Sequence, residues 1–302
     1  MQFVDPNIAR KNAFQEAHLV NAGGLPDGSP IFSEVEFNIT GLCNRLCVFC
    51  PRVDPKVFPN VNEHLDIPLY RKILTDLKDI NYTGRISYSG FGEPLLNPKH
   101  LEMIRLTREI LPECWLDIVS NGDRVTASVM KDLFQAGLTT LLISMYDGPE
   151  QVEYFEKMIE KSGLPRESVI LRERYLPPEQ GYGINVTNRA GMVSVKAVNV
   201  SVLASPMKHA CYYTHYRMMI DYTGEVLLCP HDWGKRLIAG NLSQEHLVDI
   251  WTGPALSSVR NRLGAGDRAF PPCDKCDVLG TRQGGDHFKA WQDHYQRNPA
   301  TT

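Results

Sequence analysis

The stretch Cys43-Asn44-Arg45-Leu46-Cys47-Val48-Phe49-Cys50 decides how this chain is interpreted, because it places three cysteines within eight residues. It follows residues 35–40, whose alternation of apolar and polar side chains predicts a β-strand. Three thiolates spaced C-x3-C-x2-C can hold three corners of a 4Fe–4S cluster and leave the fourth iron open to a substrate or cofactor. The alternatives are a structural zinc site completed from elsewhere in the chain, or packing of buried thiols.

Strands and helices alternate along the chain after this loop. Helices are predicted at 68–80, 98–110, 126–136 and 150–161, and strands at 85–89, 115–119, 139–145, 168–172 and 192–198. This alternation predicts an α/β fold with a parallel sheet. About six units are too few for an eight-unit barrel, so we expect a partial (β/α)6 TIM-like barrel with its active site at the C-terminal ends of the strands.

The pattern changes near residue 206. Segments 212–220 and 225–228 flank Asp221-Tyr222-Thr223-Gly224, which predicts a β-hairpin, and short helices are predicted at 246–251 and 254–263. We therefore expect three parts: an irregular N-terminal extension at 1–33, the barrel at 34–205, and a small domain with a C-terminal tail at 206–302. The glycine-rich stretch 23–28 supports the irregular extension.

The composition excludes several classes of protein. The 302 residues carry a net charge of −3, so neither nucleic acid nor an anionic membrane surface is an expected partner. No run approaches the roughly 18 apolar residues of a membrane span, and the N-terminus lacks the apolar core of a signal peptide. Eight cysteines in such a chain indicate metal or redox use in the cytoplasm rather than disulfides.

The cysteine loop resembles the signature of the radical S-adenosylmethionine (radical SAM) superfamily, C-x3-C-x-aromatic-C, with Phe49 at the aromatic place. Gly90-Phe91-Gly92-Glu93-Pro94 resembles the glycine–glutamate motif of that family, and Ser120-Asn121-Gly122 resembles its ribose-contacting region. The resemblance implies that Cys43, Cys47 and Cys50 bind the catalytic 4Fe–4S cluster. The residues it implies for S-adenosylmethionine are Phe49, Gly90, Gly92, Glu93, Ser120, Asn121, Ser144 and Arg172.

Four further cysteines, Cys211, Cys229, Cys273 and Cys276, are enough to close a second metal site. Taken alone, they fit structural zinc and an iron–sulfur cluster equally well. Beside the first motif, their layout resembles the twitch domain, the shortened form of the SPASM domain, which carries one auxiliary 4Fe–4S cluster. The spacing is similar to that of the 2-deoxy-scyllo-inosamine dehydrogenase family, whose substrate is an aminocyclitol.

The resemblance implies an oxidation. A 5′-deoxyadenosyl radical would abstract a substrate hydrogen atom, and the auxiliary cluster would accept the remaining electron. An external one-electron donor such as flavodoxin or ferredoxin would be required. His209, His215 and His231 are candidates for the base, Arg189 is a candidate substrate contact, and Cys114 is expected to be a structural cysteine.

Four functions remain in competition. The leading one is oxidation of a sugar-like or aminocyclitol small molecule. A radical SAM maturase acting on a ribosomally made precursor peptide is the alternative, and a radical SAM epimerase is a third. The epimerase is weakened because Cys114 precedes its strand and should lie at the barrel bottom. The non-enzymatic alternative is a zinc-stabilised binding protein.

Overall fold

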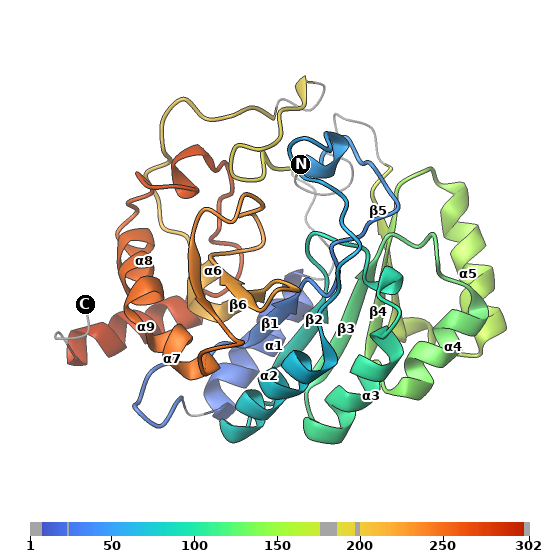
Figure 1. Cartoon of the computed structure of the whole chain (residues 1–302), viewed down its shortest axis with the longest axis horizontal. Helices are drawn as coiled ribbons and strands as arrows, with labels where there is room; N and C mark the ends of the chain where they lie inside the picture. Colours follow the sequence, from blue (N-terminus) through green and yellow to red (C-terminus); the bar gives the residue numbers. More distant parts are fainter. Residues whose placement is uncertain (1–7, 23, 176–185, 197–199, 299–302) are drawn as a thin grey trace.

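A computed structural model describes residues 8–22, 24–175, 186–196 and 200–298 of the chain (Figure 1). Its centre is one eight-stranded sheet in the order β5-β4-β3-β2-β1-β6-β7-β8. The first five strands in that order, together with β6, run parallel to one another, and β7 and β8 continue the sheet antiparallel. The predicted α/β fold class is confirmed.

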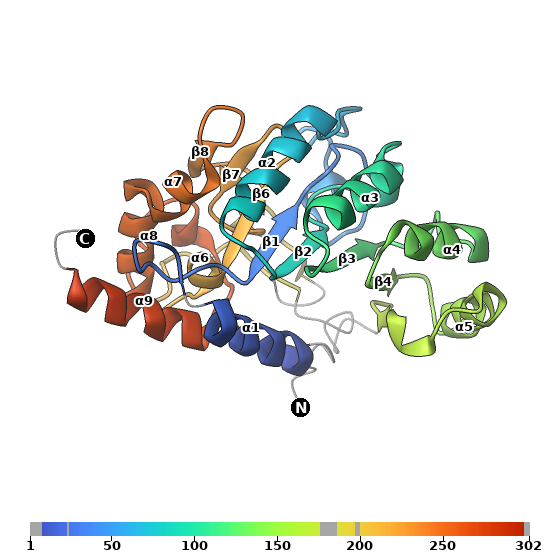
Figure 2. The ribbon, with the colours of Figure 1, turned by 90° about the horizontal axis from the view of Figure 1, so that it is seen from below.

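The barrel part alternates strands and helices as predicted. Its strands are β1 (Glu34–Phe37), β2 (Arg85–Tyr88), β3 (Trp115–Ser120), β4 (Thr140–Met145) and β5 (Val169–Glu173). The connecting helices are α2 (Ile67–Asp79), α3 (His100–Ile110), α4 (Ala127–Ala136) and α5 (Glu150–Ser162), which lie along the outside of the sheet (Figures 1 and 2). Local signals set their ends: the Thr126 side chain caps α4, and Gly137 at φ 113° ends it.

The sixth parallel strand is not where the sequence predicted it. Among the described residues near 192–198, only a single bridge between Val195 and Val200 forms, and 197–199 lie outside the described residues. The place beside β1 belongs to β6 (Arg217–Ile220), which was expected only as half of a hairpin. This strand pairs with β1 on one edge and with β7 (Glu225–Leu227) on the other, so backbone groups on both edges are satisfied.

The remaining C-terminal elements follow the hairpin. They are a short helix α6 (Tyr213–Tyr216) before β6, and then β8 (Ile238–Asn241), α7 (Leu247–Thr252) and α8 (Pro254–Gly264). Their positions agree with the predicted hairpin and two helices, except that the stretch 213–216 is helical rather than extended. The proposed domain boundaries at residues 34 and 206 remain predictions.

Two helices were missed, and the expectation that residues 1–33 are irregular was wrong for α1. The helices are α1 (Ile8–Ala22) and α9 (Gly285–Arg297), and in Figure 2 the C-terminal end of α1 meets the N-terminal end of α9. Their buried positions hold polar or aromatic side chains, so apolar periodicity is weak. In α1 these include Gln15 and His18, and in α9 they are His287, Trp291 and His294.

The strands bury two different faces. Residues facing the helices are apolar, and Val35 and Phe37 of β1 share one cluster with Met218 and Ile220 of β6. The opposite face, which lines the inside of the partial barrel, is polar and charged, with Glu34, Glu36, Arg85, Asp117 and Arg217 in register across the strands. A polar lumen favours small-molecule chemistry over a packed core.

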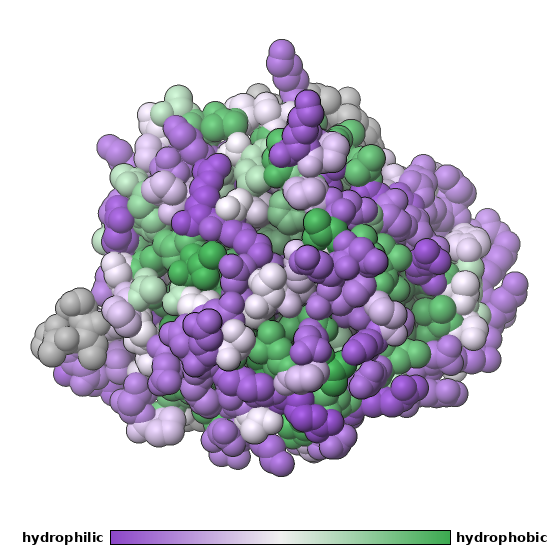
Figure 3. Space-filling view, viewed as in Figure 1, coloured by the Kyte–Doolittle hydropathy of each residue, from purple (hydrophilic) through white to green (hydrophobic). Residues whose placement is uncertain are grey.

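Among the described residues, no helix is both long and apolar enough to cross a membrane. Hydrophilic side chains cover most of the face over α4 and α5, on the right of Figure 3.

Candidate active site

The first cysteine loop leaves β1 at the C-terminal end of the strand, and Asn60 fixes its start. The Cys43 backbone N–H donates to Asn60 Oδ1 at 2.8 Å, and Asn60 Nδ2 donates back to the Cys43 carbonyl at 3.0 Å. The three thiols at 43, 47 and 50 are free and partly buried. The predicted C-x3-C-x2-C loop therefore has a defined anchor at its first cysteine.

Arg52, two residues after the last cysteine of this loop, joins the cysteine loop to the glycine–glutamate loop. Its side chain is 2% exposed. Nε donates to the Phe91 carbonyl at 2.5 Å and Nη2 to the Gly41 carbonyl at 2.9 Å, while the guanidinium lies 4.8 Å from the centre of the Phe58 ring. No sequence signal distinguished this arginine from a surface residue.

The glycine–glutamate loop packs directly against the chain between β1 and the first cysteine. A Cβ on Gly92 would lie 2.2 Å from the Thr40 carbonyl oxygen, so only glycine fits. Glu93 is 2% exposed and accepts hydrogen bonds from the Ser120 hydroxyl at 2.9 Å and from the Asn121 N–H at 2.7 Å. Burial raises the pKa of Glu93 to about 7. The structure thus brings together three of the residues predicted to bind S-adenosylmethionine.

A second set of contacts ties the cysteine loop to the ends of β3 and β4. Asn121 Nδ2 donates to Asn44 Oδ1 at 2.7 Å. Arg45 forms ion pairs with Asp123 and with Asp147, the latter at 2.7 Å. The Phe49 ring stacks on Tyr146 with ring centres 5.6 Å apart. These contacts hold the cysteine loop over the strand ends.

The remaining predicted cofactor residues are Gly90, Ser144 and Arg172. Ser144 and Arg172 are neighbours in register on β4 and β5 and face the inside of the sheet. Gly90 has φ 104°, and a Cβ there would lie 2.9 Å from Met219 Cε.

The second cysteine set converges on one small cavity. All four thiols, at 211, 229, 273 and 276, line a cavity of about 20 Å³ with Leu228, Leu263 and Val278 among its apolar walls. Gly280 passes so close that a Cβ there would lie 2.3 Å from Cys211 Sγ. The structure therefore gathers four cysteines that span 66 residues of sequence.

Two buried polar side chains hold these four cysteines in place. Arg268, 2% exposed, donates to the carbonyls of His209 at 3.0 Å and Val278 at 2.6 Å, which joins the loops around the first and the last cysteine. Asn188 donates to the Lys275 carbonyl at 2.7 Å and so fixes the Asn188–Gly191 turn to the C-x2-C loop. Sequence reasoning noted this turn but not Arg268.

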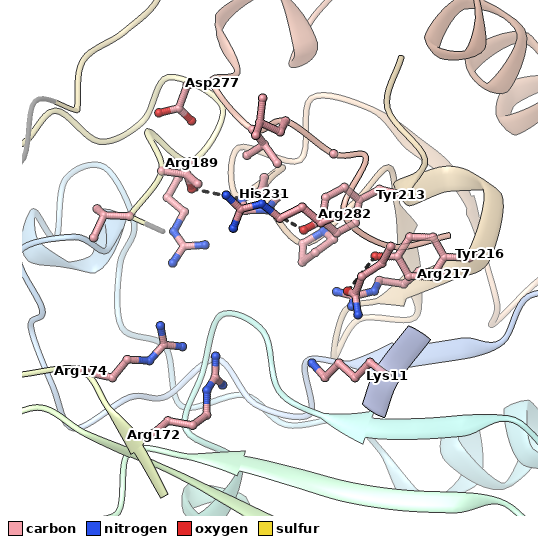
Figure 4. A pocket seen from close by; sticks show the side chains of 17 residues that line it. Lys11, Arg172, Arg174, Arg189, Tyr213, Tyr216, Arg217, His231, Asp277 and Arg282 are labelled. Atoms are coloured by element: carbon pink, nitrogen blue, oxygen red, sulfur yellow. Dashed lines mark hydrogen bonds between the residues drawn. The ribbon is translucent and has the colours of Figure 1, made fainter. Parts of the chain in front are cut away.

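A large cavity lies between β5 and β6, with Arg172 of β5 and Arg217 of β6 among the residues that line it. It has a volume of about 410 Å³ and is walled by the barrel and by the loops of the second cysteine set (Figure 4). Arg189, the predicted substrate contact, and Arg172 both line it. Of the three candidate base histidines, only His231 lines this cavity, where its Nε2 is 3.5 Å from the Tyr213 hydroxyl.

Cys114 lies away from both cysteine sets. It is 2% exposed, belongs to the main apolar core, and immediately precedes β3. The first cysteine loop lies at the opposite, C-terminal end of the strands. This placement agrees with a structural cysteine.

The donor sets fit iron–sulfur clusters. Burial raises the pKa of Cys47 to about 12 and of Cys276 to about 11, so a bound metal would have to displace thiol protons. Among the described residues, no three His, Cys, Asp or Glu side chains converge closely enough to chelate one metal ion. Zinc needs all its ligands within about 2.3 Å of one point, whereas each thiolate on a 4Fe–4S cluster binds its own iron.

Comparison with known families agrees with this geometry. The radical SAM superfamily model matches residues 37–170, and the SPASM model, an iron–sulfur cluster-binding domain, matches residues 211–277. The chain is a radical SAM oxidoreductase with a SPASM-type auxiliary domain. Its cofactors are S-adenosylmethionine and 4Fe–4S clusters, and the zinc-stabilised binding protein is not supported.

Among characterised proteins, the chain is similar to the S-adenosyl-L-methionine-dependent 2-deoxy-scyllo-inosamine dehydrogenase of Niallia circulans. The two are 26% identical over 249 residues, covering 82% of this chain and 93% of the relative. The crystal structure of BtrN with AdoMet and 2-DOIA matches the fold with a TM-score of 0.70, at 24% identity over 85% of this chain and 98% of BtrN. Streptococcus suis SuiB bound to precursor peptide SuiA matches at a TM-score of 0.53, with 15% identity over 83% of this chain and 70% of SuiB.

Proposed function

We propose that this enzyme oxidises a hydroxyl group of a sugar-like or aminocyclitol small molecule to a carbonyl. The observation that carries the proposal is the cavity of about 410 Å³ between the barrel strands and the second cysteine set. That volume is typical of sites for small ligands. The likeness to an aminocyclitol dehydrogenase over 82% of the chain supports the same reaction class.

The two cysteine sets have different tasks in this proposal. Cys43, Cys47 and Cys50 hold a cluster with one open iron, and Cys211, Cys229, Cys273 and Cys276 hold a cluster that the protein closes completely. When bound, these groups would supply the one-electron chemistry that removes a carbon-bound hydrogen atom of the substrate and accepts the remaining electron. The hydroxyl proton leaves to a base or to water, which completes the two-electron oxidation.

The protein positions S-adenosylmethionine at the ends of β2 to β5. Gly92 lets the backbone of its loop approach closely. Glu93 is joined by hydrogen bonds to Ser120 and Asn121 beside the cysteine loop. Phe49, within that loop, stacks on Tyr146. Gly90, Ser144 and Arg172 complete the proposed set. Arg172 offers a guanidinium fork that suits the methionine carboxylate.

The outer surface of the first cysteine loop is open to an electron donor. Leu46 and Val48 are 67% and 51% exposed. We propose that flavodoxin or ferredoxin delivers the electron here, and that the enzyme works in the reducing cytoplasm. The barrel at 34–205 and the auxiliary domain at 206–302 remain our proposed division.

The test is anaerobic reconstitution followed by measurement of iron and of 5′-deoxyadenosine. We expect about eight irons per chain from two 4Fe–4S clusters, and cleavage of S-adenosylmethionine under reductant. The triple variant Cys43→Ala/Cys47→Ala/Cys50→Ala should keep about four irons and lose cleavage. Cys114→Ala is the matched control and should keep both. Cleavage that persists in the triple variant would refute the assignment.

A further inference from the structure

The cavity between β5 and β6 has an unusual charge. Among its 17 lining residues, six are cationic and one, Asp277, is a carboxylate. Figure 4 shows the side chains pointing into one space from separate elements of the fold. The six cations are Lys11, Arg172, Arg174, Arg189, Arg217 and Arg282.

The nearby carboxylates are already engaged. Arg217 forms ion pairs with Glu34 at 2.9 Å and Glu36 at 2.6 Å, and Glu34 also pairs with Arg85 at 2.6 Å. Both carboxylate oxygens of Asp277 accept hydrogen bonds from the Asn188 N–H, at 2.9 and 3.0 Å. These carboxylates neutralise part of the positive charge of the cavity and leave the rest of that charge in place.

Three of the cations are not held in such pairs, although Glu34 acts on Lys11 and Asp277 on Arg189 through their charges. Among the described residues, Lys11, Arg189 and Arg282 form no ion pair, and their side chains donate no hydrogen bond. Arg189 Nε is buried without a partner, and its turn is fixed to the C-x2-C loop through Asn188. Burial and the neighbouring charges of Arg85, Arg172 and Arg217 lower the pKa of Lys11 to about 8. Such crowding of like charges costs stability unless a ligand offsets it.

S-Adenosylmethionine does not account for this charge. S-Adenosylmethionine carries a sulfonium and an ammonium against one carboxylate, so it uses one cation and adds positive charge to the site. The cysteine sets have their own buried arginines, Arg52 and Arg268, which act on the thiols at 43, 50, 211, 273 and 276. Among the cavity cations, Arg189 also acts on the first cysteine loop, where its charge lowers the pKa of Cys50 more than that of Arg52 does.

We propose that the substrate is a phosphorylated sugar or cyclitol, whose phosphate is bound by Lys11, Arg189 and Arg282. The proposal rests on the oxidation proposed above and adds the substrate class. A phosphate dianion accepts hydrogen bonds from several cations at once, which suits three donors arriving from different elements. A cationic aminocyclitol would meet like charge in this cavity, so of the substrates proposed above the sugar-like or uncharged cyclitol skeleton is the one this inference favours.

Binding to the reconstituted holoenzyme tests the proposal without turnover. Calorimetry would compare myo-inositol 1-phosphate, myo-inositol and glucuronate, in the presence of S-adenosylmethionine and without reductant, at constant ionic strength. We expect the phosphate to bind at least about tenfold more tightly than either other probe. Equal binding of neutral inositol, or tighter binding of glucuronate, would overturn the phosphate assignment even if the enzyme cleaves S-adenosylmethionine and oxidises alcohols.

Variants locate the site. Arg282→Gln and Lys11→Gln should each weaken phosphate binding about tenfold, and Arg282→Lys should recover part of the loss. Arg166→Gln, which removes an exposed cation paired with Glu156, is the control and should bind like the wild type. Iron content and melting temperature show that each variant is folded. Folded cavity variants that bind the phosphate normally would refute the site.

Discussion

Arg52 offers a quantitative test of how the cysteine loop is held, because Arg52→Met keeps the length of the side chain and removes its donors. The variant removes the hydrogen bonds that Arg52 donates to the carbonyls of Phe91 and Gly41 and to Asn60 Oδ1. The last of these joins Arg52 Nη1 and Asn60 Oδ1 at 3.0 Å. Hydrogen bonds from charged groups contribute about 1.5–3 kcal/mol each, and unpaired buried acceptors cost about 1–3 kcal/mol. We expect a total loss of about 3–5 kcal/mol, the range found when a buried charged group loses its partners.

The assay is thermal melting of the holoenzyme under anaerobic conditions, with iron counted on the same sample. The expected loss corresponds to a drop in melting temperature on the order of 10 °C. Iron should fall toward about four per chain, because only the first cysteine loop depends on Arg52. Arg166→Met, which breaks a half-exposed ion pair, should cost less than about 1 kcal/mol. The reasoning fails if Arg52→Met melts like the wild type and retains all its iron.

Three further predictions concern the loops around the two cysteine sets. Gly92→Ala should displace the Thr40 carbonyl and lower iron at the first site, whereas Gly285→Ala, where a Cβ meets nothing within 4 Å, should not. Gly280→Ala should lower the iron of the auxiliary set only, read from the iron count of the triple cysteine variant; unchanged iron would contradict the close packing on Cys211. Because burial raises the pKa of Glu93 to about 7, its folded form binds a proton more tightly than the unfolded chain, and stability should fall as pH rises through that range. The fall is about 2 kcal/mol between pH 5.5 and 8, measured by melting temperature, and Glu93→Gln should flatten it; an equal slope in that variant would show that another group titrates.

The sequence was sufficient where local rules determine the structure. Thr126 and Gly137 mark the ends of one helix, and alternating residues in β1 to β4 mark the strands. The two cysteine sets could also be recognised from the sequence. The spacing of the cysteines by itself indicates metal binding and does not depend on how the chain packs. The parallel sheet also predicted that Glu93, Ser120 and Asn121 lie together, because the C-terminal ends of parallel strands lie along the same edge of the sheet.

The sequence was insufficient where contacts are distant. The buried faces of α1 and α9 carry His18, Gln15 and His287 rather than aliphatic side chains, so their periodicity is hidden. Arg268 and Arg282 look like surface cations in the sequence, and only the fold turns one toward four carbonyls and the other into the cavity. The positive charge of the cavity comes from side chains in five separate segments of the chain, so no single sequence motif predicts it.

The pairing of β1 with β6 also sets the order of events during synthesis. Glu34 meets Arg217, a residue made 183 positions later. At about 5–20 residues per second, one edge of β1 stays without its partner for roughly 10–40 s, and during the last roughly 2–9 s of that time β2 to β5 have already been synthesised. Unpaired edges invite association with other chains. Slow translation or truncation before residue 217 should therefore shift the product toward aggregates, and a chaperone that shields this edge should rescue it.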